Sequence, residues 1–408
     1  MTRRGSSDPT IPADRRHNLS ANEQAVLDKV RIPFRKKIVT RIWYVKLRLQ
    51  FTGWLQYLVP NMVMLVIFLL AALAVLLGLK TLAVIIAGMG TLLLLMNLFD
   101  LATVKLKIRF PEQLPKRNDD LDLFDLMRAR RSCRSFQTRK MTQGDREELL
   151  RSVDLHSSAA TFGNEKVRFE FISAPLTVWP TVNASEFLVA IAPREYNRLA
   201  VIDVGRTLQK IVMDATCMGL GTCWIGPGAD HASIMKDLGH RFDPDKDHII
   251  CVCAVGYRSR YIPLFIRIFN AQFHNRLPLS SLFFTGPDFK TPLDLEADPF
   301  NRFGRNFEIC QWAPSSYNGQ TTRCTAGYEG MGDDHRLARF DFYTSIASRY
   351  YAPVALGIWC ANWEMGCEAL GIQGHFAILT GEAQGFGNDE STPEFPHYDM
   401  SWVLDEKF

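Results

Sequence analysis

Three arginines and a serine lie within five positions, where together they could bind an anion. Arg130, Arg131, Ser132 and Arg134 follow an apolar, helix-like stretch at 121–127. A guanidinium group donates paired hydrogen bonds to phosphate oxygens, and a serine hydroxyl can add one more. The cluster therefore predicts a phosphate-binding turn, although a solvated basic turn or a contact with a membrane surface would use the same residue types.

Two further segments are rich in the residues from which ligand-binding loops are built. Gly219–Pro227 contains several glycines, so its backbone N–H groups can approach a flat ring without interference from side chains. Ala313–Gln320 reads Ala-Pro-Ser-Ser-Tyr-Asn-Gly-Gln, which combines a proline-fixed turn with short polar side chains. Without a ligand, the first would be a tight turn after a strand and the second an ordinary surface loop.

Taken together, these three segments resemble signatures of the FMN-dependent nitroreductase-like family. The resemblance implies FMN as the cofactor and NAD(P)H as the co-substrate. It also implies that residues from all three segments hold the FMN, namely Arg130, Arg131, Ser132, Arg134, Trp224, Ile225, Gly226, Pro314, Ser315, Ser316, Asn318 and Gln320.

The resemblance assigns separate roles to these residues. Arg130 and Arg131 would hold the phosphate, and Ser132 would contact the phosphate or the ribityl chain. Arg134 would lie near flavin N1 and O2, where negative charge accumulates on reduction. Gly226 is the candidate backbone donor to flavin N5, although several family members carry an acidic residue there and this chain continues with Pro227.

The distance between the segments predicts a duplicated chain. In the family, the arginine segment and the Pro-Ser-Ser-x-Asn segment normally occur within one short stretch of a subunit and serve two different sites of a dimer. Here a domain's length of sequence separates them, which predicts two fused repeats that form a pseudo-dimer. Residues 214–221 and 364–371 also match, since each reads as a helix that ends at glycine before a strand.

A second, symmetric site would need an arginine cluster at the start of repeat two and a Pro-Ser-x-x-Asn loop in repeat one. Repeat two begins instead with Asn301–Asn306, and repeat one offers only His156–Asn164. One FMN per chain is therefore predicted, capped by Ser315, Ser316 and Asn318 of repeat two.

The predicted fold is α+β and nitroreductase-like, with two tandem repeats preceded by a two-helix transmembrane hairpin. The expected divisions are residues 1–50 (polar and basic), 51–104 (hairpin), 118–260 (repeat one), 261–300 (wrapping linker) and 301–408 (repeat two). Hydrophobic periodicity and capping residues predict helices at 143–154, 203–218, 232–238, 301–311 and 355–369, and strands at 167–173, 187–192, 222–225, 249–255 and 376–380.

Two apolar runs, Met62–Leu79 and Thr81–Phe99, are each long enough to cross a bilayer as a helix. A buried helical hairpin of a soluble protein is the alternative. Lysines and arginines flank both ends of the pair, so both termini and the catalytic part are expected on the cytoplasmic or equivalent organellar side. Upstream, residues 32–51 fit either a basic amphipathic helix or a strand, and residues 1–25 are polar.

Composition and residue spacing limit which partners and which chemistry the sequence is compatible with. The net charge is only +4 in 408 residues, so no general binding of nucleic acid is expected. The nine cysteines lack paired spacing and are interpreted as reduced core thiols. No set of cysteines and histidines has the spacing of metal ligands, and flavin chemistry would require no protonatable catalytic side chain.

The leading hypothesis is a membrane-anchored FMN oxidoreductase that passes hydride from NAD(P)H to a nitroaromatic, a quinone or a similar small acceptor. The hairpin favours a lipid-soluble acceptor such as a quinone. The alternative is a non-catalytic or weakly active flavin-fold subunit of a membrane protein complex, docked to its partners through the hairpin. A flavin-dependent dehalogenase or ring-cleaving enzyme on the same fold stays open as a third reading.

Overall fold

The computed structural model describes residues 38–39, 41–42, 45–46, 49, 53–176, 178–226, 229–271, 275–330, 336–379 and 396–408. Residues 1–25, which are polar, lie outside these ranges. So do Pro227 and Thr380, the last residue of the strand predicted at 376–380. Every residue described between 38 and 49 is helical.

The first repeat is built on a four-stranded antiparallel sheet. Its strands are β1 (Arg168–Ser173), β2 (Glu186–Pro193), β3 (Gly221–Ile225) and β4 (Asp247–Gly256), in the order β1-β2-β4-β3. Successive side chains of β2 point to opposite faces. Leu188 and Ala190 pack on the face covered by α6 (Gln143–Ser157) and α7 (Arg198–Cys217), whereas Phe187 and Val189 pack on the face covered by α8 (His231–Leu238).

The second repeat has the same sheet with one strand added. Its strands are β5 (Phe283–Phe284), β6 (Thr322–Glu329), β7 (Arg336–Thr344), β8 (Gly374–Ala377) and β9 (His397–Leu404), in the order β5-β6-β7-β9-β8. Without β5, the four strands of each sheet lie side by side in the same order, which is first, second, fourth and third by position in the chain. In both repeats a long helix joins the second strand to the third. This shared topology confirms the predicted two-repeat architecture.

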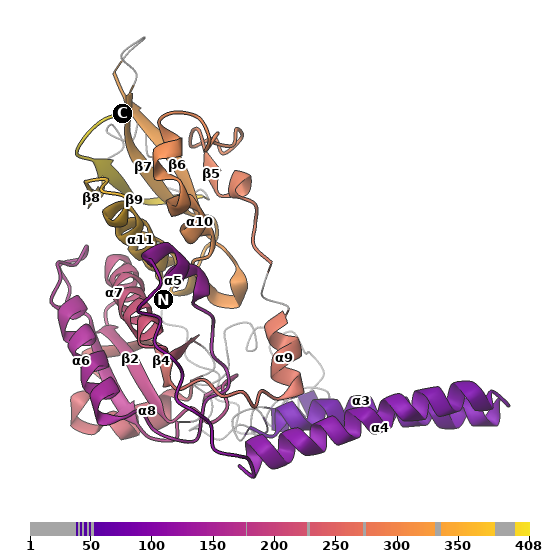
Figure 1. The fold of residues 1–408 in the computed structure, drawn as a ribbon. Helices are drawn as coiled ribbons and strands as arrows, with labels where there is room; N and C mark the ends of the chain where they lie inside the picture. The colour runs from indigo at the N-terminus through magenta and orange to yellow at the C-terminus, as the bar shows by residue number, and fades with distance from the viewer. Residues whose placement is uncertain are drawn as a thin grey trace.

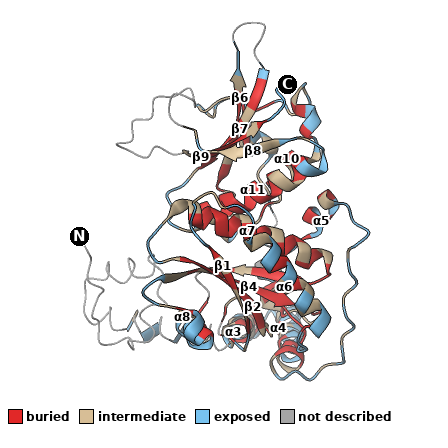
Figure 2. Ribbon diagram, turned by 90° about the vertical axis from the view of Figure 1, so that its left-hand side faces the viewer, coloured by how far each residue is buried: buried red, intermediate tan, exposed pale blue. Residues whose placement is uncertain are grey.

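The long helices α7 and α11 (Tyr351–Ala369) pack against each other between the two sheets (Figure 1), and both are largely buried there (Figure 2). Their backbones approach closely at two glycines. A Cβ atom added to Gly205 would lie 2.3 Å from the carbonyl oxygen of Val354, and one added to Gly357 would lie 1.9 Å from that of Ile202. The two repeats therefore meet as a pseudo-dimer at positions where only glycine fits.

The internal sequence match corresponds to two equivalent helix ends. Helix α7 ends before Met218, and Gly219 follows with φ +78°. Helix α11 ends before Leu370, and Gly371 follows with φ +71°. Glycine adopts this left-handed conformation without steric strain, and a strand follows each of the two turns.

A helical hairpin projects from the side of the first repeat (Figure 1). It consists of α3 (Leu55–Leu76) and α4 (Lys80–Asp100), and the chain reverses at Gly78 with φ +77°. By length and composition both helices could cross a membrane. Most of their large apolar side chains are exposed, for example Leu69 and Val84. A helix that is apolar on nearly every face needs an apolar environment.

A short helix, α9 (Leu264–Ala271), packs against the base of this hairpin. The backbone N–H at its start, from Leu264, donates to the Asp100 carboxylate over 2.6 Å. Just before α9, the carbonyl oxygen of Tyr261 accepts a hydrogen bond of 2.6 Å from the Ser135 hydroxyl. The base of the hairpin is thus joined to the segment of the first repeat that holds the arginines.

The chain between the repeats then runs along the second repeat. In β5, Phe283 is fully buried, with its ring centroid 4.8 Å from that of Phe307 in α10 (Arg305–Gln311). The predicted helix at 301–311 is divided in two. A 3₁₀ turn covers Phe300–Phe303, and α10 begins after Gly304, which has φ +40°.

The structure also contains elements that the sequence pattern does not predict. Strands β6, β7 and β9 are not assigned from the sequence. Apolar and polar residues alternate along Tyr398–Trp402, but both faces are buried, because Asp341 and Ser401 are buried as well as Phe340 and Met400. Helix α7 begins five residues before the predicted position 203. Its start is set by Asn197, whose side-chain oxygen accepts hydrogen bonds from the first helical N–H groups.

Candidate cofactor site

Arg130 lies at the C-terminal end of α5 (Leu123–Ala129), where the predicted arginine cluster begins. Only 5% of the residue is exposed, and its Nη1 has no hydrogen-bond partner among the residues that the structure describes. Burial, together with the charges of Arg276, Arg131 and Arg258, lowers the pKa of Arg130 to about 10. A buried cation without a counter-ion is costly, so this position favours binding of an anion.

A tryptophan ring connects the first-repeat arginines to the second repeat. The guanidinium of Arg131 lies over the Trp312 ring at 5.1 Å from its centroid, and that of Arg276 lies at 5.3 Å. Trp312 immediately precedes the predicted capping segment, Ala313–Gln320. Two segments far apart in the sequence therefore lie side by side, as the predicted composite site requires.

The residues after the arginines run beside β3. Ser132 forms a parallel bridge with Thr222, and the Cys133 N–H donates to the Thr222 carbonyl over 2.7 Å. A Cβ atom added to Gly221 would lie 2.7 Å from Cβ and Sγ of Cys133. Gly221 is therefore required for packing within the first repeat, independently of any contact between its backbone and a cofactor. Gly226 is half-buried, and an added Cβ there would lie 3.3 Å from Cε1 of Tyr351 at the start of α11.

Three other predicted residues have different surroundings. Arg134 donates from Nη1 to the side-chain oxygen of Asn270 in α9 over 2.6 Å, so it faces the base of the hairpin. Trp224 packs against the cores of both repeats, and its buried indole N–H has no partner in the described part of the chain. Ile225 is buried in the first repeat's core, so only its backbone is positioned to contact a cofactor.

The capping segment has an unusual backbone. Tyr317, Asn318 and Gln320 all have positive φ angles, of 52°, 54° and 45° respectively. Each such angle costs a residue other than glycine about 1–3 kcal/mol, and residues of this kind cluster at binding sites. The turn is supported by the Ser315 hydroxyl, which accepts a hydrogen bond of 2.9 Å from the Gln320 N–H.

Two polar side chains of this segment are bonded to the linker between the repeats. Asn318 accepts a hydrogen bond of 2.6 Å from Nη1 of Arg276 and donates one of 2.6 Å to the carbonyl of Asn275. Gln320 accepts a hydrogen bond of 2.8 Å from the N–H of Leu277. The linker therefore positions the capping segment.

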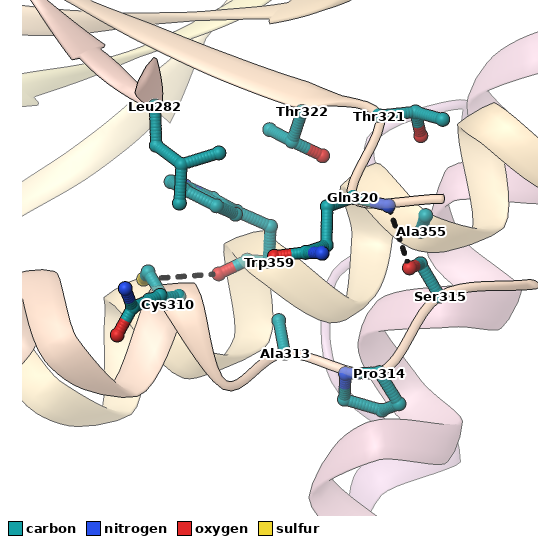
Figure 3. A pocket seen from close by; sticks show the side chains of 11 residues that line it. Leu282, Cys310, Ala313, Pro314, Ser315, Gln320, Thr321, Thr322, Ala355 and Trp359 are labelled. Carbon is teal, nitrogen blue, oxygen red and sulfur yellow. Dashed lines mark hydrogen bonds between the residues drawn. The ribbon is translucent and has the colours of Figure 1, made fainter. Parts of the chain in front are cut away.

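A pocket opens beside the capping segment (Figure 3). It encloses about 260 Å³, its open mouth included. Figure 3 shows side chains from the segment, from α10 and α11, and from the linker, among them Ala313, Pro314, Ser315, Gln320, Cys310, Ala355, Trp359 and Leu282. Pro314 and Ser315 thus line a cavity, whereas Asn318 is turned to the linker.

The structure brings two arginines to the site that the sequence motifs do not include. Arg258 follows β4 and forms an antiparallel bridge with Phe136, and its charge acts on Arg130 and Arg131. Arg276 lies in the linker. A single arginine forms no recognisable sequence motif. For Arg258, the only local signal is Gly256 at the end of β4, because a glycine there allows another part of the chain to approach closely.

Comparison with known proteins identifies the family. A family model described as "Putative TM nitroreductase" matches residues 122–358, which is more than half of the chain. The chain belongs to the nitroreductase family. No protein of curated function matches it at a significant level.

Solved structures of nitroreductases resemble parts of the chain. A nitroreductase from Thermotoga maritima is 17% identical, with a TM-score of 0.42 over 74% of this chain and 99% of that one. A nitroreductase family protein from Clostridium difficile 630 is 22% identical, with a TM-score of 0.31 over 39% and 95% of the two chains. A nitroreductase with bound FMN from Bacteroides fragilis is 14% identical, with a TM-score of 0.29 over 34% and 90%.

The donor groups around Arg130 fit the phosphate end of FMN. Nη1 of Arg130 and Nε of Arg276 are buried and without hydrogen-bond partners among the described residues. A phosphate is a dianion with three acceptor oxygens, and such an acceptor would satisfy both groups. The neighbouring charge of Arg131 adds to the attraction.

The segments in which a symmetric second site would lie contact other parts of the protein. At the start of repeat two, Arg305 is bonded to Asp122 and Asp125, so its charge is compensated. In repeat one, Phe162 of the 156–164 loop meets Phe376 of β8, with ring centroids 5.1 Å apart. Residues of both segments thus have partners within the chain, and the loss of the second site stays a prediction.

Proposed function

We propose that the protein is a membrane-anchored, FMN-dependent oxidoreductase that uses NAD(P)H to reduce a nitroaromatic, a quinone or a similar electron-poor acceptor. Membership of the nitroreductase family supports the reaction class. The observation that carries the proposal is Arg130, a buried cation beside Arg131 and Arg276 that has no ionic partner among the residues described, at the junction of the two repeats.

We assign the binding roles as follows. Arg130, Arg131 and Ser132 would hold the phosphate, while the backbone of 224–226 and the segment Pro314–Gln320 would enclose the ring. When bound, FMN supplies hydride transfer between NAD(P)H and the acceptor. The role of Arg134, which would stabilise negative charge on the cofactor, rests on the family resemblance alone, since its guanidinium donates to Asn270 at the base of the hairpin.

Membrane anchoring is the part of the proposal that rests on the hairpin. The apolar, exposed faces of α3 and α4 suit a bilayer, and the lysines that follow α4, Lys105 and Lys107, suit the cytoplasmic or equivalent side. Because α9 contacts both the hairpin and Arg134, a lipid-soluble acceptor such as a quinone is the favoured substrate.

The proposal is tested with the full chain purified in mild detergent and supplied with FMN. We expect an absorption spectrum of bound flavin, bleaching of that spectrum by NADH or NADPH, and its return when a quinone is added. A protein that binds no flavin would refute the cofactor. Bound flavin that neither nucleotide reduces would refute the reaction.

A second candidate is a non-catalytic or weakly active subunit of a membrane complex. The contact of Phe162 with Phe376 supports it, because a loop that would be needed for a second site packs on the protein instead. In this case the chain would co-purify with partner proteins at a fixed ratio, and it would oxidise neither nucleotide with any acceptor.

A further inference from the structure

Large apolar side chains stay exposed where the chain leaves the hairpin for the first repeat. Beyond α4 and the π-helical turn Leu101–Lys105, cationic and apolar residues alternate along the chain. The apolar ones, Leu106, Ile108 and Phe110, are 59%, 68% and 77% exposed. Apolar side chains gathered on a surface in this way mark sites of interaction with a protein or a membrane.

Arg109, which lies between the last two of these residues, is turned inward and holds the segment against the first repeat. Its Nη1 donates to the Ser259 hydroxyl over 3.0 Å and pairs with Glu112 at 3.5 Å. Glu112 in turn accepts a hydrogen bond of 2.7 Å from the Arg260 N–H. The Arg109 guanidinium also lies over the Tyr261 ring at 5.3 Å from its centroid. The exposed segment is therefore fixed beside the residues that lead into α9.

Helix α9 continues this surface at the base of the hairpin (Figure 1). The Tyr261 ring lies 6.4 Å from that of Phe99 in α4, and Ile268 of α9 is 56% exposed. We call the two segments Leu106–Phe110 and Arg260–Ile268 together the collar.

The collar carries only positive charge. No Asp or Glu occurs in either of its segments, and Lys107, Arg260 and Arg267 are exposed. The carboxylates beside it, those of Asp100 and Glu112, are almost wholly buried and accept hydrogen bonds from backbone N–H groups of the collar. A surface that is both apolar and cationic is complementary to the interfacial region of a bilayer with anionic headgroups.

We propose that the collar docks on anionic phospholipids, with Leu106, Ile108 and Phe110 in the acyl boundary and the cations among the headgroup phosphates. The inference rests on the proposed function, because the hairpin brings the collar to the bilayer. It goes further, since a hairpin alone selects no lipid class and leaves the first repeat free to tilt. The Ser135 hydroxyl donates to the Tyr261 carbonyl over 2.6 Å, so docking also fixes the arginine segment relative to the bilayer.

The test uses the full chain in vesicles of phosphatidylcholine, with or without phosphatidylserine. An environment-sensitive NBD fluorophore is attached at Phe110→Cys. The matched control is Leu155→Cys, since Leu155 is 68% exposed and α6 lies on the side of the first repeat away from the hairpin (Figure 1). Wild-type protein treated in the same way gives the background from the native cysteines.

In vesicles with phosphatidylserine we expect the label at position 110 to emit at shorter wavelength than the control label, and to be quenched severalfold less by acrylamide. The shift should be smaller in phosphatidylcholine alone. Each cation near an anionic surface multiplies the ratio of docked to undocked protein by about fivefold. The combined variant Lys107→Gln, Arg260→Gln and Arg267→Gln should therefore remove the difference between the two lipid compositions.

A label at position 110 that is as accessible as the control label would overturn the proposal, and so would protection that is independent of phosphatidylserine. Protection that rises with the ratio of protein to lipid would assign the collar to a second copy of the chain, which overturns it too. These results leave membrane anchoring intact, provided that the wild type resists extraction from the vesicles at alkaline pH. A chain that is extracted would remove the anchoring and the collar proposal with it.

Discussion

Arg130 combines properties that seldom occur together in one guanidinium group: it is buried, it has no acidic partner in the described structure, and its nearest charges are other arginines. Two buried or half-buried arginines elsewhere in the chain follow the usual pattern. Arg198 is bonded to Asp399 at 2.5 Å, and Arg206 to Glu364 at 2.9 Å. From this contrast we infer that a ligand, rather than the fold, compensates the charge of Arg130.

A substitution at this residue should therefore separate binding from stability. In Arg130→Ala we expect FMN affinity to fall at least about tenfold, because a charge-assisted contact is lost. The flavin-free protein should be as stable as the wild type or more stable, because a buried, unpaired charge is removed. Thermal melts with and without FMN measure both effects.

Arg305→Ala is the control for this experiment, since Arg305 is bonded to Asp122 and Asp125 at the opposite end of α5. It should leave the melting shift produced by FMN unchanged. A flavin-free Arg130→Ala protein that melts well below the wild type would show instead that Arg130 stabilises the fold.

At this same scale, the sequence predicts part of the candidate site. Arg130, Arg131 and the 313–320 segment are recognisable because several suitable residues occur together, and the structure places them side by side. Arg258 and Arg276 are not recognisable, since each is a single arginine that reaches the cluster only through folding. The linker bonds of Asn318 are likewise invisible until the chain is folded.

At the scale of secondary-structure elements, the pairing of α7 with α11 holds the two repeats together. The helix ends at Gly219 and Gly371 are predictable, because a glycine that ends a helix is a local signal. The burial of polar residues in β7 and β9 is not predictable, because Asp341 and Ser401 bond each other only when these two strands pair.

The close approach of these helices predicts an unusual result for an alanine substitution. Alanine normally stabilises a helix relative to glycine by up to about 1 kcal/mol. At Gly357, however, the added Cβ would lie 1.9 Å from a backbone oxygen of α7. We expect Gly357→Ala to destabilise the protein by about 2 kcal/mol or more, as measured by denaturant unfolding.

Gly144 in α6 is the matched control, because an added Cβ there would meet nothing within 4 Å. Gly144→Ala should leave stability unchanged or raise it. If Gly357→Ala and Gly144→Ala both raised the free energy of unfolding, that result would contradict the close packing of α7 on α11.

A further contact between the repeats should depend on pH. His248 of β4 stacks on Tyr350, with ring centroids 5.2 Å apart. Burial, with the charges of Arg349 and Arg194, lowers the pKa of His248 below its ordinary value of about 6.5. Its contribution to stability is therefore fully present above about pH 6.5 and is lost as the pH falls through the folded-state pKa.

Melting temperatures measured between pH 7.5 and 5 test this expectation. The wild type should lose stability on acidification more steeply than His248→Phe, which keeps an aromatic ring but cannot take up a proton. Parallel losses in the two proteins would show that His248 does not contribute to the pH dependence.

At the scale of the whole molecule, one chain contains the two halves that a dimer would otherwise provide, and the halves have diverged. At one junction Arg130 and Arg276 have no ionic partner in the part of the chain that the structure describes, and the capping segment is strained. At the other, Phe162 and Phe376 pack together, and Arg206 lies over the Phe162 ring at 4.6 Å. The hairpin adjoins the first of these junctions through α9. We infer that one cofactor site is kept, next to the membrane segment, and that the other is now structural.

The number of FMN molecules bound per chain tests this account most directly. It is measured by saturating the purified full-length protein with FMN, removing the excess, and comparing flavin released on denaturation with protein concentration. The account predicts one FMN per chain, and close to none in Arg130→Ala under the same conditions. Two FMN molecules per chain would show that the second site is still functional, and none in the wild type would show that the arginine cluster serves another ligand.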